Sequence, residues 1–128
     1  NDGEITKIIK TSIIGHELNS CNSLLDWFLN SEGSVSGYSQ AMWNGNTTLE
    51  WAKACLELIN NWNTWETETI IKSYCISKFE LLTEIADIYE INTEIKSDAS
   101  VVVDKCLVKG KQRNPISIQL KELKEFYE

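Results

Sequence analysis

The sequence predicts an all-α fold, a single-domain bundle of five or six helices. Three observations lead to this prediction. Apolar residues recur at helical spacing through most of the 128 residues, no pair of alternating segments flanks a hairpin turn, and the chain has one proline and six glycines. A chain of this length is most simply one domain, so residues 1–128 are expected to form one helical domain.

The N-terminal part contains two helical patterns followed by a polar connection. The apolar stripes are formed by Ile5, Ile8, Ile9 and Ile13, and then by Leu18, Cys21, Leu25 and Phe28. Residues 31–46 are rich in Ser, Gly and Asn, which are turn-forming residues, and predict a loop-rich connection. A short helical turn is expected within it, around Tyr38, Met42 and Trp43.

The clearest helix start lies at Thr47. Residues 47–50 follow the capping-box pattern, in which the Thr47 hydroxyl accepts the third helical amide and Glu50 reaches back to the cap. A helix is therefore expected from this point. Its apolar stripe comprises Trp51, Cys55, Leu58 and Trp62.

A long helix is expected next, over residues 70–95. Its stripe comprises Ile71, Cys75, Phe79, Leu82, Ala86 and Tyr89. Asp98 could cap a short helix that ends at Gly110. Val101–Val103 is the one stretch that could form a strand, but it has no evident pairing partner nearby. A basic loop over residues 109–115 precedes a final helix that begins at Pro115 and turns Ile116, Leu120, Leu123 and Tyr127 to one face.

Four cysteines form an even set, and each lies in an apolar stripe. They are Cys21, Cys55, Cys75 and Cys106. In a short secreted chain such a set predicts two disulfides between helices, and pairing of neighbours, Cys21–Cys55 and Cys75–Cys106, is weakly favoured. The alternative is four buried thiols in a reducing compartment. No CxxC pair exists, so the sequence predicts no metal site.

The N-terminus and composition favour a secreted, soluble protein. The chain begins at Asn1 without an initiator Met or apolar leader, as after removal of a signal peptide. Asn46 lies in an Asn-Thr-Thr tripeptide that fits the glycosylation pattern. No stretch is long and apolar enough to span a membrane. The excess of 19 acidic over 12 basic residues argues against nucleic-acid binding.

No combination of residues predicts catalysis. His16 is the single histidine, and the chain has no Gly-rich phosphate loop and no metalloprotease or serine-hydrolase pattern. The sequence therefore predicts a protein that is not an enzyme and has no cofactor.

Two features could form a protein-binding surface. Trp43 and Trp65 lie beside turn signals and are expected to be partly exposed, although tryptophans at helical spacing are more often in the core. Acidic residues of the long helix could steer a basic partner, although such a face is more often simply solvated. They are Glu80, Glu84, Asp87, Glu90 and Glu94.

These features together predict a monomeric, non-enzymatic, secreted binding protein, an inhibitor or effector of the kind found in feeding secretions or parasites. One alternative is a helical carrier of an apolar small molecule or lipid, enclosed by the Ile and Trp stripes. A second is an intracellular acidic immunity protein that blocks a basic toxin, which would require free thiols.

Overall fold

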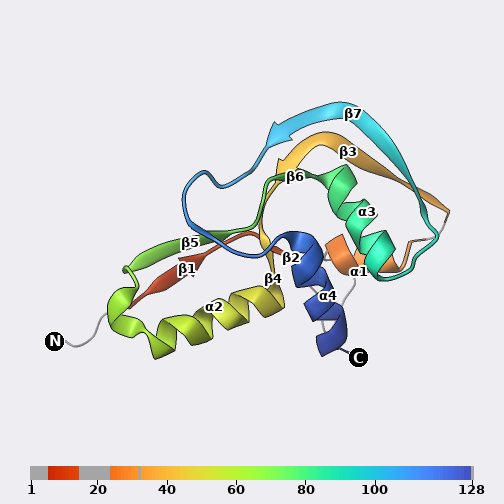
Figure 1. Cartoon of the computed structure of the whole chain (residues 1–128). Coiled ribbons are helices and arrows are strands. Elements are labelled where there is room, and N and C mark those ends of the chain that lie inside the picture. Colours follow the sequence, from red (N-terminus) through yellow and green to blue (C-terminus); the bar gives the residue numbers. More distant parts are fainter. Residues whose placement is uncertain (1–5, 15–23, 32, 128) are drawn as a thin grey trace.

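The chain folds as a mixed α/β protein, and the prediction of an all-α bundle is wrong (Figure 1). The computed structural model describes residues 6–14, 24–31 and 33–127. The elements in these ranges are β1 (Ile8–Lys10), β2 (Ile13–Ile14), α1 (Leu24–Leu29), β3 (Ser34–Trp43), β4 (Asn46–Thr47), α2 (Thr48–Asn60), the 3-10 turn η1 (Trp62–Thr64), β5 (Glu68–Lys72), β6 (Ile76–Ser77), α3 (Lys78–Ile88), β7 (Glu94–Asp104), β8 (Lys111–Gln112) and α4 (Ile116–Phe126).

One part of the molecule is a parallel sheet covered by α2, which we call the parallel-sheet unit. Its strand order is β1-β5-β8, and both pairings are parallel. Figure 1 shows α2 running alongside β1 and β5. Ala54 and Leu58 of α2 pack with Trp65 and with Ile71 of β5 in a small buried cluster. Parallel strands joined through a helix are typical of α/β proteins.

The other part is a mixed sheet with the order β6-β3-β7, which we call the mixed-sheet unit. The central strand β3 pairs antiparallel with β6 and parallel with β7, and in Figure 1 β3 and β7 curve together over α3. The main core lies under this sheet, where side chains of α1, α3 and α4 meet. Its buried members are Leu25, Phe28, Leu81, Leu82, Ile85, Ile116, Leu120 and Leu123.

A buried polar segment, residues 44–46, connects the two units. The Gln119 side chain of α4 donates to Asn46 Oδ1 at 2.8 Å and accepts from the Thr47 amide at 2.9 Å. Gly45 lies so close to the Ser12 carbonyl and the Trp43 ring that an added Cβ would collide with both. The close backbone approach therefore requires glycine at this position.

The expected long helix over residues 70–95 is a strand, a turn and a shorter helix. β5 ends at Lys72, and α3 begins only after Ser77, whose side chain accepts from the Glu80 amide while Glu80 bonds back to the Ser77 amide. This capping box marks the start of α3, but the continuous apolar pattern over residues 70–95 made that start hard to recognise in the sequence. Ile70 and Ile71 belong to a strand because β-branched residues fit the pleated sheet well.

The loop-rich connection and the short helix at Asp98 are also corrected by the structure. Most of residues 31–46 form β3, and residues 94–104 form β7, so Val101–Val103 lie in a strand after all. Their partner is β3, about 60 residues earlier in the chain, which local reasoning could not supply. Asp98 does not cap a helix, because its carboxylate accepts from the Ser100 amide within β7.

Two predicted helix starts are confirmed. Thr47 caps α2 and accepts from the Glu50 amide at 3.1 Å. Pro115 directly precedes α4, whose Ile116, Leu120 and Leu123 are buried on one face. No helix in the described ranges has the length and apolar character needed to cross a bilayer.

Candidate functional site

A depression of about 350 Å³ on the mixed-sheet unit has the most ligand-like lining, and we call it the Trp27 pocket. It lies where α1, β3 and α3 meet. Its lining residues are Trp27, Ser34, Val35, Ser36, Tyr38, Lys78 and Leu82. The Trp27 side chain is 45% exposed, so its ring is available for contact.

Local structure explains how these side chains converge. Ser34, Ser36 and Tyr38 are alternate residues of β3, and alternate residues of a strand point to the same face. Lys78 is the first residue of α3, directly after the Ser77 cap. The lining therefore combines the Lys78 ammonium, the hydroxyls of Ser34, Ser36 and Tyr38, and the aromatic rings of Trp27 and Tyr38.

Charge distinguishes this pocket from four other depressions on the described surface. Among the described residues of its lining, Lys78 is the only charged one, and it makes no ion pair with another described residue. The linings of the other four are neutral or acidic in sum. In a chain of net charge −7, this pocket is thus suited to an anionic group.

The Trp27 pocket can bind a molecule that is aromatic at one end and anionic at the other. Exposed aromatic rings stack on nucleobases without requiring one base in particular. Ammonium and hydroxyl groups donate to phosphate oxygens, and the bonds from the cation are the stronger ones. These two properties together point to a nucleotide-like ligand.

The strongest ion-pair cluster is centred on Arg113, and it is already satisfied. The guanidinium contacts Glu50 Oε2 at 2.6 Å and both carboxylate oxygens of Glu57 at 2.8 Å. The hydrogen bond to Glu57 is the largest cause of a raised Arg113 pKa, and the same bond lowers the pKa of Glu57. Because two carboxylates bind the single guanidinium, this cluster fixes β8 and α4 to α2 and has no positive charge left for an anionic ligand.

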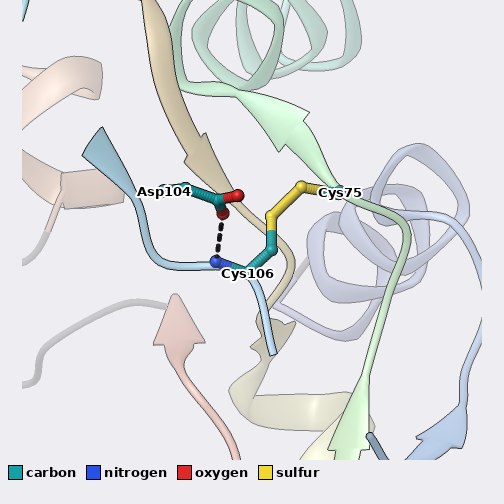
Figure 2. A group of neighbouring side chains, drawn as sticks. All are labelled: Cys75, Asp104 and Cys106. Carbon is teal, nitrogen blue, oxygen red and sulfur yellow. Dashed lines mark hydrogen bonds between the residues drawn. A yellow bond between two sulfur atoms is a disulfide. The ribbon is translucent and has the colours of Figure 1, made fainter. Parts of the chain in front are cut away.

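Of the two favoured pairings, Cys75–Cys106 is present and Cys21–Cys55 is not, because Cys55 is a free thiol. The disulfide that forms joins two connections and not two helices. Cys75 and Cys106 form a disulfide between two connections, one before β6 and one after β7, with their Cα atoms 5.9 Å apart (Figure 2). Cys55 is a free thiol on α2, and partial burial raises its pKa. Cys21 and His16 lie outside the described residues.

Of the two tryptophans expected to be partly exposed, Trp43 is so and Trp65 is not. Trp65 is 8% exposed and packs in the cluster under α2, with the Lys111 ammonium 4.2 Å from its ring centroid. Trp43 is half-buried against the main core. The exposed tryptophans are instead Trp27, Trp51 and Trp62.

The acidic residues of the expected long helix are divided between elements. Glu80, Glu84 and Asp87 lie on α3, Glu90 follows it, and Glu94 begins β7. All five are exposed or half-exposed, and Glu90 lies 3.9 Å from the Lys124 ammonium. Steering of a basic partner by this surface stays a prediction.

Asn46, the expected glycosylation site, is fully buried. Its side chain donates to Thr11 Oγ1 at 2.8 Å and accepts from Gln119 at 2.8 Å. A glycan on this nitrogen would require both contacts to open, because the attached sugar must reach solvent. The fold therefore has no room for a glycan at Asn46.

Comparison with known proteins finds similar structures but no matching family model or curated sequence. No family model and no curated protein matches the sequence. The fold is similar to a dTDP-4-dehydrorhamnose reductase from Clostridium acetobutylicum, with a TM-score of 0.75, 13% identity, and coverage of 94% of this chain and 48% of that one. It is also similar to the reductase of that name from Yersinia enterocolitica, with a TM-score of 0.69, 12% identity, and coverage of 94% and 50%.

These likenesses overturn the prediction of a non-enzymatic binding protein, whether an inhibitor or effector, an apolar carrier or an immunity protein. The fold is not the expected helical bundle but is similar to that of proteins named as reductases. The chain spans about half the length of the solved structures that it matches. Secretion itself stays a prediction.

The residues of this chain do not fit the dinucleotide site of a Rossmann fold. That site needs a Gly-x-Gly-x-x-Gly turn between a strand and a helix, because the backbone must approach the pyrophosphate closely. No such sequence occurs in the chain. In the described ranges, β5 is followed by Ser73 and the turn to β6 and not by a glycine-rich turn into a helix.

Proposed function

We propose that this chain forms the nucleotide-sugar-binding part of a reductase-like enzyme. The observation that carries the proposal is the TM-score of 0.75, over 94% of the chain, with a protein named for reducing dTDP-4-dehydrorhamnose. That substrate is a thymidine diphosphate joined to a keto sugar. Its base, diphosphate and sugar are the groups that such a part must hold.

The Trp27 pocket supplies groups for the nucleotide end of this ligand. Trp27 can stack on the pyrimidine, a contact worth about 1–3 kcal/mol per base in other proteins. Lys78 and the Ser34 and Ser36 hydroxyls can donate to the diphosphate. The ammonium is the stronger of these donors, because hydrogen bonds to charged groups contribute about 1.5–3 kcal/mol.

The reductant belongs to a part that this chain does not supply. Without the glycine-rich turn, its residues have no place for the pyrophosphate of a dinucleotide. A separate cofactor-binding part would complete the enzyme, consistent with matches that cover about half of each reductase. The role of this chain is then to bind and orient the nucleotide sugar.

The parallel-sheet unit has a strand edge and exposed apolar side chains against which a cofactor-binding part could pack. β1 pairs with β5 on one side and with no other described strand, although all-parallel sheets normally continue under cover on both faces. Three large apolar side chains beside this sheet are exposed, namely Trp51 and Ile59 of α2 and Trp62 of η1. The Lys7 ammonium lies 4.8 Å from the Trp62 ring centroid, so Trp62 adjoins the start of β1.

Titration with thymidine diphosphate tests the proposal. We expect saturable binding by calorimetry, weakened at least tenfold by Trp27→Ala and by Lys78→Met. Trp51→Ala and Lys96→Met serve as matched controls, because both side chains are exposed but lie outside the pocket lining. Absence of binding, or equal losses in the control variants, would refute the assignment.

A further inference from the structure

The disulfide between Cys75 and Cys106 has a carboxylate beside it. The two sulfur atoms and a carboxylate oxygen of Asp104 all lie within 4.8 Å of one another. Figure 2 shows the three side chains together, with the Asp104 carboxylate accepting a hydrogen bond from the Cys106 amide at 2.9 Å. Cys75 and Asp104 are exposed, so solvent reaches the group.

The topology of the mixed sheet brings these residues together across the end of β3. On one side of β3, Trp43 pairs with Ile76, directly after Cys75. On the other side, Met42 pairs with Asp104, two residues before Cys106. Both neighbours of β3 therefore pass its last residues at the same level. This arrangement, and not sequence spacing, produces the cluster.

We propose that Cys75, Cys106 and Asp104 bind a zinc ion when the disulfide is reduced. An external dithiol supplies the two electrons and two protons, the S–S bond breaks, and two thiols form while the reductant becomes a disulfide. Zinc then displaces the two thiol protons, and each sulfur binds as thiolate. The proposal is independent of the proposed function, because it concerns these three side chains alone.

The geometry and ligand chemistry suit zinc. Zinc binds sulfur at about 2.3 Å with tetrahedral angles, which places neighbouring ligands about 3.7 Å apart. Once the S–S bond is broken, the sulfurs must move apart to reach that separation, and both lie in short connections and not within a helix or a strand. Two thiolates select zinc over magnesium or calcium, which prefer oxygen ligands.

The carboxylate is positioned in advance and the fourth ligand position is open. The hydrogen bond from the Cys106 amide fixes one Asp104 oxygen, leaving the other to face the sulfurs. Such outer contacts orient a ligand and are worth ten- to a hundredfold in metal affinity. With three protein ligands at an exposed site, water or another molecule would occupy the fourth position.

The test is metal binding to the reduced chain. After reduction with a phosphine, we expect one zinc per molecule with a dissociation constant below about 1 µM, measured by chelator competition. Cobalt should give a sulfur-to-metal charge-transfer band. The oxidised chain should bind at least a hundredfold more weakly, because its sulfurs are not thiolates.

Variants separate this site from adventitious thiol binding. Cys75→Ser and Cys106→Ser should each weaken zinc binding at least a hundredfold, and Asp104→Asn about tenfold while keeping an acceptor for the Cys106 amide. Cys55→Ser is the matched control and should bind as the unaltered chain does, because this thiol lies on α2 outside the cluster. Unchanged binding in Cys75→Ser or in Asp104→Asn would overturn the three-ligand site.

Discussion

Removal of the Arg113 guanidinium should cause a large loss of stability, because it leaves a buried carboxylate alone. The Glu50 side chain is 4% exposed and receives the guanidinium at 2.6 Å, whereas the Glu57 side chain is 48% exposed. Breaking a buried pair from one side costs about 3–5 kcal/mol, while an exposed pair contributes about 0–1 kcal/mol. Arg113→Met should therefore cost about 4 kcal/mol and Glu57→Gln less than about 1 kcal/mol.

Urea unfolding followed by far-ultraviolet circular dichroism measures this difference. With a denaturant dependence of about 2 kcal/mol per molar, Arg113→Met should lower the midpoint by about 2 M. The double variant Glu50→Met with Arg113→Met should recover at least about 2 kcal/mol, because it removes the isolated charge. The reasoning fails if Arg113→Met costs less than about 1 kcal/mol, or if the double variant is no more stable than the single one.

Three further predictions concern the same fold. The Arg113 hydrogen bond lowers the Glu57 pKa, so the unaltered chain should be more stable than Glu57→Gln above the ordinary pKa of about 4.3. This difference in stability should disappear as the pH falls through the lowered pKa of Glu57 in the folded chain. A difference that grows in acid would contradict this. Gly45→Ala should cost about 1–3 kcal/mol in urea unfolding, because its Cβ would strike the Ser12 carbonyl; an unchanged midpoint would exclude the collision. Leu120→Ala should cost about 2–5 kcal/mol, and the matched Ile118→Ala, at a position 43% exposed, much less in thermal unfolding; equal losses would contradict the assigned core.

Local signals located two helix starts, but they also predicted a helix at Asp98 that is a strand, and they predicted the wrong fold class. Thr47 and Pro115 mark true helix starts because capping depends on a few adjacent residues. The prediction of the fold class failed because a short buried strand and one face of a helix can both appear in the sequence as a run of apolar residues. Ile70 and Ile71 continued the stripe of α3 by coincidence, and the Ser77–Glu80 capping box was the signal that separated them.

The candidate sites depend on contacts between distant parts of the chain. Trp27 and Lys78 line one pocket although 51 residues separate them, because β3 and α3 pack side by side. Cys75 and Cys106 are 31 residues apart and meet across the end of β3. The chain has no CxxC pair, and sequence spacing could not detect side chains that a sheet brings together.

The exposed tryptophans form two groups: one could contact a ligand, and the other could pack against a further part of the protein. Trp27 lies in a pocket beside a cation, where an exposed ring can serve a ligand. Trp51 of α2 and Trp62 of η1 are exposed beside the parallel sheet, where Ala54 and Leu58 of α2 are already buried. Lys7 directly precedes β1, and its ammonium lies 4.8 Å from the Trp62 ring centroid, so Trp62 adjoins the strand whose outer edge pairs with no described strand. One added strand and helix would cover both this edge and these rings, as expected if a cofactor-binding part completes the sheet.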